Sequence, residues 1–231
     1  MSISSLCKTA AAITLVCASS LAGAVSLADL SSKDASSGVK AALEKGASAA
    51  VSKLGVENGF LNNEKVKIGL PGVLEKAMPI LRMTGQGKKL DELQVSMNHA
   101  AESAVALAKP LLLDAVKSMS VTDAKNILSG GETSVTDFFR QKTATPLTAK
   151  FLPVVKKITD RNGLSPQYNA LMGKASSSGL VSKEESTVES YVTQRALDGL
   201  YTIIAEEEKA IRADPIGTGS AILGKVFGAM K

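Results

Sequence analysis

The chain has 231 residues, of which 45% are hydrophobic and 21% charged, and its formal net charge at pH 7 is +5. This composition is too hydrophobic and too mixed in sign for wholesale disorder, and no apolar run reaches the eighteen or so residues of a transmembrane helix. The small, interleaved excess of positive charge, the lack of tryptophan and the scarcity of other aromatic residues exclude a typical nucleic-acid binder.

Residues 1–24 have the three-part pattern of a secretory signal peptide. Lys8 supplies the positive charge, an apolar stretch covers 9–16, and small residues lead to Ala22-Gly23-Ala24. We therefore expect export to the periplasm and cleavage after Ala24. Lipid attachment at Cys17 is the less favoured alternative, because the preceding Val16 is not small. Cleavage after Ala24 removes both cysteines, Cys7 and Cys17, so the expected mature chain has no thiol and no disulfide.

After the signal peptide, residues 25–33 are expected to be flexible and residues 34–231 to form one all-helical domain. The first helix is predicted over 34–54, where Val39, Leu43 and Ala47 begin one narrow apolar stripe. Gly55 is a natural end for it.

The only strand-like stretch is 65–70. Its apolar residues Val66, Ile68 and Leu70 alternate with polar or small residues before Pro71-Gly72 breaks the run. Because one strand cannot form a sheet, we expect a short extended segment or a small β-hairpin within 59–70.

From residue 72 onward the pattern is helical. Helix boundaries are indicated by capping residues, by prolines at first helical positions and by glycine stops. They predict helices at 72–83, 87–119 and 120–130, and further helices that begin at 134, at Thr145-Pro146 and at Ser165-Pro166. A capping box at 186–189 begins a long helix to about 212, and a final helix begins at about 220. No internal repeat of about 20–50 residues accompanies them. The sequence therefore predicts a single all-α bundle of about eight helices.

The last long helix carries acidic residues on its apolar face. With Ile204 at the centre of that face, Glu207 and Glu208 both fall within the stripe that should contact the core. A buried carboxylate is costly unless it is paired or protonated, and Arg212 lies one turn after Glu208. We expect a paired cluster that locks the helix; the alternative is a ligand site formed by Glu207, Glu208, Arg212 and Asp214. Acid–base catalysis has the least support, since no nucleophile accompanies the pair.

Two further features suggest sites only weakly. The amides of Gly217, Thr218, Gly219 and Ser220 precede the expected final helix and could bind an anion, although no lysine follows as in a phosphate loop. His99 is the only histidine and has Glu102 one turn later, so an ordinary surface pair is expected. We assign no metal ligands, cofactor or catalytic residues.

Several strings carry a resemblance to a known family. They are KVKIGLPG (65–72), MNHAAESAV (97–105), AKNILSGGE (124–132), FLPVVKK (151–157), YVTQRALDGLY (191–201) and IAEEEKAIRADPIGTGS (204–220). Together they resemble the uncharacterised exported bacterial family numbered 4197 among the domains of unknown function, and the last string is the most specific. The resemblance covers nearly the whole mature chain. It implies a mostly helical envelope protein without an assigned activity or catalytic residues.

The sequence thus favours a soluble, non-enzymatic periplasmic binding or interaction module, with an envelope protein or a small ligand as its partner. One alternative is a carrier of an amphiphilic ligand, with Glu207 and Glu208 at the polar end of an apolar cavity. The other is an unrecognised hydrolase that uses the same carboxylates. The oligomeric state is left open.

Overall fold

The computed structural model describes residues 32–161, 165–177, 179, 181–182 and 185–214. Within these residues all regular structure is helical: α1 (Ser32–Leu54), α2 (Gly72–Met83), α3 (Gly87–Val105), α4 (Lys109–Lys117), α5 (Val121–Ser129), α6 (Ser134–Arg161), α7 (Ser165–Ser177) and α8 (Val188–Ala213). The all-α prediction is confirmed. The predicted signal peptide, the glycine segment 217–220 and the helix predicted from 220 lie outside the described residues.

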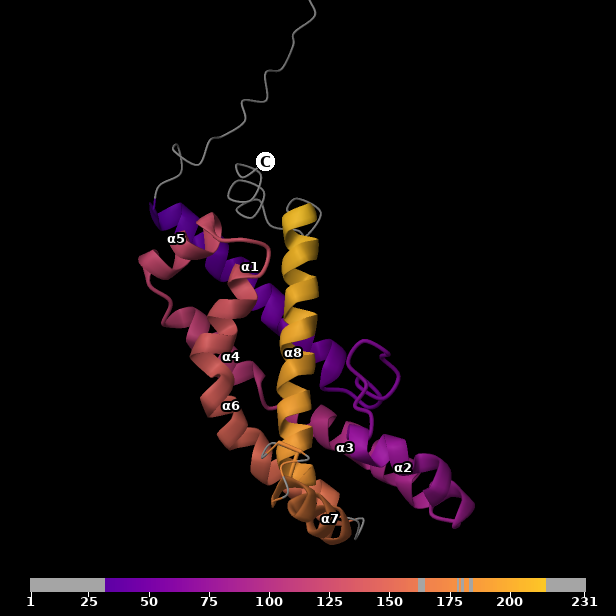
Figure 1. Ribbon diagram of the computed structural model, residues 1–231. Coiled ribbons are helices and arrows are strands. Elements are labelled where there is room, and N and C mark those ends of the chain that lie inside the picture. Colours follow the sequence, from indigo (N-terminus) through magenta and orange to yellow (C-terminus); the bar gives the residue numbers. More distant parts are fainter. Residues whose placement is uncertain (1–31, 162–164, 178, 180, 183–184, 215–231) are drawn as a thin grey trace, which may run out of the picture.

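Helix α8 is the central element of the bundle. It packs against α6, α1 and α3, and α6 also packs against α3 (Figure 1). The side chains that it buries recur every three or four residues, as in Val192, Ala196, Leu200 and Ile203. Thr187 caps its first turn by accepting a hydrogen bond from the Ser190 N–H at 3.1 Å. None of the helices described is long and apolar enough to cross a membrane.

Residues 64–66 form a turn and residues 67–70 have no regular secondary structure, so the predicted β-hairpin is wrong: none of the described residues forms a strand. The side chain of Asn98 in α3 takes the place of a neighbouring strand. Its Oδ1 accepts the Ile68 N–H at 2.8 Å and its Nδ2 donates to the Ile68 carbonyl at 2.9 Å. Tyr191 of α8 donates to the Gly69 carbonyl at 3.1 Å. These bonds satisfy backbone groups that a hairpin would otherwise pair.

The helices are divided differently from the prediction at two places. The helix predicted over 87–119 is two helices, because α3 ends at Val105 and α4 begins at Lys109. Pro110 lies in the first turn of α4, where its missing N–H costs nothing, whereas inside a continuous helix it would clash with the preceding turn. Conversely, Pro146 begins no helix, since α6 continues through it.

The buried side chains around Pro146 explain why α6 continues through this proline. On either side of Pro146, α6 buries Phe139, Leu147 and Phe151 completely in the core. Burying each such side chain is worth about 1.5–3 kcal/mol, so together they offset the roughly 3 kcal/mol that an internal proline costs. The predicted capping box at Ser120 is present, with mutual hydrogen bonds between Ser120 and Asp123.

A close approach between α8 and the 55–63 loop requires a glycine at position 199. A Cβ on Gly199 would lie 2.6 Å from Cε1 of the buried Phe60 ring and 3.3 Å from the Val66 Cβ. We expect Gly199→Ala to lower the free energy of unfolding by about 1–3 kcal/mol, because such overpacking displaces the ring or the helix. Urea unfolding followed by circular dichroism measures the change. Gly173→Ala in α7 is the control and should not destabilise, since a Cβ there contacts nothing within 4 Å.

The three tyrosines of the chain, Tyr168, Tyr191 and Tyr201, are all buried. Burial raises the pKa of each phenol, because it disfavours the charged form. Their contribution to stability is therefore complete below the unfolded pKa of about 10 and is lost as the pH rises through the higher folded values. In an alkaline titration, tyrosinate absorbance should appear together with the loss of helical circular dichroism. A tyrosinate signal from a chain that is still folded would contradict this expectation.

Candidate functional site

Glu208 is a buried carboxylate that caps the start of another helix. Its side chain is 1% exposed. Its Oε1 accepts the Val135 N–H, and its Oε2 accepts both the N–H and the hydroxyl of Thr136, each at 3.1 Å. Val135 and Thr136 lie in the first turn of α6, where backbone N–H groups have no partner within the helix and the helix dipole favours a negative charge.

Arg212 completes this arrangement. Its Nε and Nη2 lie 3.2 and 3.0 Å from Glu208 Oε1, so the pair expected from their one-turn spacing is present. The same Nη2 donates to Ser134 Oγ at 2.8 Å and to the Ile127 carbonyl at 3.3 Å. The two side chains therefore join α8 to the end of α5 and the start of α6. The adjacent cavity has a volume of about 10 Å³, which is room for about one water.

The other acidic residues near the end of α8, among them the predicted Glu207 and Asp214, are more accessible. Glu207 forms an ion pair with Lys53 of α1, and Glu206 pairs with Lys65. Asp214 ends α8, and its N–H donates to the Ala210 carbonyl at 3.0 Å. These contacts favour a structural role for the cluster. Ligand binding by Glu207, Glu208, Arg212 and Asp214 stays a prediction.

The predicted surface pair of His99 and Glu102 is wrong, because Glu102 of α3 is a second buried carboxylate, only 4% exposed. Its Oε1 accepts the N–H groups of Phe60 and Leu61 at 3.1 and 3.2 Å, and its Oε2 accepts that of Asn58 at 3.1 Å. Asn58 has a φ of 63°, so the loop turns sharply here and its amides converge on one point. The available signal was the placement of Glu102 among small apolar residues in HAAESAVALA, which makes it an unusual surface residue.

A groove lies beside His99, between α3 and the C-terminal half of α6. Its volume is about 590 Å³. Val95 and Ile158 form its apolar walls. The other lining residues are polar or charged: Lys88, Asp91, Glu92, Ser96, His99 and Arg161. Pockets of several hundred Å³ with apolar walls and a few polar groups are typical of small-molecule sites.

Two polar atoms in this groove are buried without a hydrogen bond. They are the Ser96 hydroxyl and His99 Nε2, neither of which has a partner among the described residues. Ser96 is 5% exposed. His99 Nε2 lies 4.0 Å from Glu102 Oε2, which is beyond hydrogen-bond distance. Both atoms have almost no exposed surface, so a molecule in the groove would reach them only after the Ser96 or His99 side chain turned toward it.

A second groove of about 460 Å³ runs between residues 65–72 and α8. Charged residues line it, and several are already engaged: Lys65 pairs with Glu206, and Arg195 lies over the Tyr191 ring, 5.2 Å from its centre. Glu75 and Asp198 add negative charge. This groove is more polar than the α3–α6 groove and less suited to a small apolar molecule. The described residues contain no cluster of three or more potential metal ligands among His, Cys, Asp and Glu.

A family model described as "Protein of unknown function (DUF4197)" matches residues 29–228. The chain belongs to this family. No curated protein and no solved structure matches it. The match covers every helix described here, and within this DUF4197 chain the strings that carried the resemblance contain Asn98, Glu102, Gly199, Glu208 and Arg212.

Proposed function

We propose that this DUF4197 chain is an exported, non-enzymatic binding module whose ligand occupies the α3–α6 groove. The observation that supports the proposal is the groove of about 590 Å³, whose lining combines the apolar Val95 and Ile158 with charged and polar residues. The signal-like residues 1–24 support the exported location.

The lining favours an amphiphilic small molecule. Val95 and Ile158 offer contact to an apolar body, and polar and charged residues lie beside them in the lining. Lys88 and Arg161 can pair with an anionic head group. This places the polar end of the ligand in a different part of the bundle from Glu207 and Glu208.

The buried carboxylates support a role in binding rather than hydrolysis. Glu208 and Glu102 each accept backbone N–H groups, as described above. Glu189 accepts from Asn169 Nδ2 at 3.1 and 3.3 Å and lies 3.6 Å from Lys156 Nζ. Each is thus engaged in holding segments together, whereas a general base must be able to reach a substrate proton.

A fluorescent fatty acid, cis-parinaric acid, tests the groove directly. The wild-type chain should enhance its fluorescence saturably, and Val95→Lys should weaken the affinity by at least about tenfold, because the new ammonium would have to lose water against the apolar tail. Val121→Lys is the matched control, since Val121 is also exposed but lies on α5. No saturable binding, or equal loss in both variants, would overturn the proposed site.

The exported location has a separate test. Expression of the full chain in a Gram-negative host and N-terminal sequencing of the periplasmic product should give a mature protein that begins at Val25. A product that retains residues 1–24 in the cytoplasm would contradict export, and an acylated N-terminal Cys17 would identify the lipoprotein alternative.

A further inference from the structure

Helix α2 and the first half of α3 form an arm that projects from the bundle (Figure 1). The main packing partner of α2 is α3. The inner face of α2 is apolar, with Leu74 buried and Met78 partly buried against the core. A short turn around Gly85, which has a φ of 79°, joins the two helices at the outer end of the arm.

The outer face of α2 is apolar as well. Val73, Ile80 and Met83 are all exposed, Ile80 by 67% and Met83 by 89%. With Lys76 they follow the spacing i, i+3, i+7 and i+10, so they form one stripe along the helix. Single exposed apolar residues are ordinary, but a stripe on a projecting helix is typical of a surface that contacts another body.

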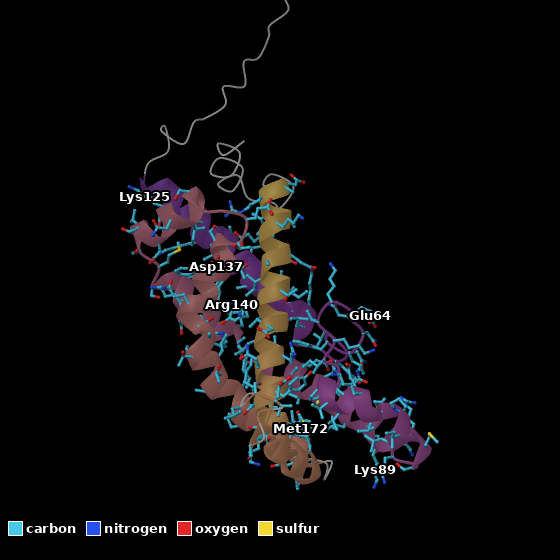
Figure 2. All side chains as sticks on the ribbon, viewed as in Figure 1. Glu64, Lys89, Lys125, Asp137, Arg140 and Met172 are labelled. Carbon is cyan, nitrogen blue, oxygen red and sulfur yellow. The ribbon has the colours of Figure 1, made fainter. Side chains whose placement is uncertain are left out.

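The arm has a small excess of positive charge. Residues 72–92 contain four basic residues, Lys76, Arg82, Lys88 and Lys89, and three acidic residues, Glu75, Asp91 and Glu92. Asp91 lies 2.9 Å from Arg82, and Glu92 lies 3.9 Å from Lys88. Lys76 lies within the apolar stripe, and Lys89 lies at the far end of the arm, close to the joining turn (Figure 2). The arm thus combines exposed apolar side chains with two lysines outside these ion pairs.

We propose that the α2–α3 arm docks the protein on an anionic lipid surface. Ile80 and Met83 enter the interface between head groups and acyl chains, and Lys76 and Lys89 contact the lipid phosphates. An apolar stripe flanked by lysines is the pattern by which peripheral helices bind anionic membranes. Each lysine or arginine near such a surface strengthens binding by about fivefold, and burial of an isoleucine or methionine side chain adds at least about tenfold.

The charge also argues against a second copy of the chain as the occupant of this stripe. Dimers usually form around a two-fold axis, which brings the same surface of both copies together. Here that would bring together two copies of a surface that has a small net positive charge and Lys76 within its stripe. An anionic lipid surface neutralises this charge instead. This inference goes beyond the proposed ligand groove and does not depend on it.

Vesicle flotation with the full chain tests the proposal. The chain should float with vesicles of phosphatidylglycerol and phosphatidylcholine in equal parts, and much less with phosphatidylcholine alone. Binding should fall by at least about tenfold in Ile80→Ser/Met83→Ser and in Lys76→Gln/Lys89→Gln. The control Val56→Ser/Val121→Ser changes two exposed valines outside the arm and should bind as the wild type does. Circular dichroism confirms that each variant folds.

The lack of tryptophan provides a second measurement. Met83→Trp would introduce a lone indole at the end of α2, and its emission should shift to the blue on vesicles that contain phosphatidylglycerol. Val121→Trp should show no shift. The proposal is overturned by absence of flotation with anionic vesicles, by equal loss of binding in the valine control, or by a dimer that Ile80→Ser/Met83→Ser abolishes without any lipid binding.

Discussion

Glu208→Ala should lower the free energy of unfolding by about 3–5 kcal/mol, because removing one partner of a buried ion pair leaves the other charge uncompensated. In this variant the largely buried Arg212 guanidinium loses its carboxylate partner. The Val135 and Thr136 N–H groups lose the oxygen atoms that accept their hydrogen bonds. Three helices lose their shared contact, since the cluster joins α8 to α5 and α6. Urea unfolding monitored by circular dichroism at neutral pH measures the effect.

Two controls separate a buried pair from surface charge. Glu206→Ala removes the neighbouring carboxylate and its pairing with Lys65, which is mostly exposed, so a change of at most about 1 kcal/mol is expected. The double variant Glu208→Leu/Arg212→Met removes both charges and should cost less than the sum of the single variants Glu208→Leu and Arg212→Met. If Glu208→Ala behaves as Glu206→Ala does, the cluster carries no structural role.

The helical projection located this cluster only in part. It placed Glu207 and Glu208 together on the apolar face, and Glu208 is indeed buried. Glu207, one position earlier, reaches Lys53 at the edge of α1. A projection gives the direction of a side chain from its own helix axis, but the neighbouring helix decides where the covered face ends. The partner Arg212 could be predicted because it is local; Val135 and Thr136 are more than seventy residues away along the chain.

At residues 65–70, as at the Glu208 cluster, the sequence predicted the local pattern but not the partner that lies far away along the chain. The alternation there correctly predicted the inward side chains, as Val66, Ile68 and Leu70 are all buried. It could not identify what pairs with the backbone, because a strand and the Asn98 amide present the same donor and acceptor. The α3–α6 groove was likewise beyond prediction, since its residues come from two stretches about sixty positions apart.

Glu102→Ala should lower the free energy of unfolding by about 3 kcal/mol or more, because each buried N–H left without an acceptor costs about 1–3 kcal/mol. The Asn58, Phe60 and Leu61 amides would lose their shared acceptor. Glu102→Gln should cost less, since its amide oxygen can still accept the Phe60 and Leu61 N–H groups. Its NH₂ group would then face the Asn58 N–H, a contact between two donors.

The location of the effect distinguishes a loop anchor from a general contribution to the core. Amide hydrogen exchange should accelerate at Asn58, Phe60 and Leu61 in Glu102→Ala before it changes in α6 or α8, because loss of the carboxylate opens the loop first. Glu57→Ala, in the same loop but exposed, should leave these amides unchanged. Since Phe60 also packs on Gly199, an anchored loop predicts that Gly199→Ala accelerates exchange at the same amides. Acceleration spread evenly over the chain would mean that Glu102 stabilises the bundle as a whole.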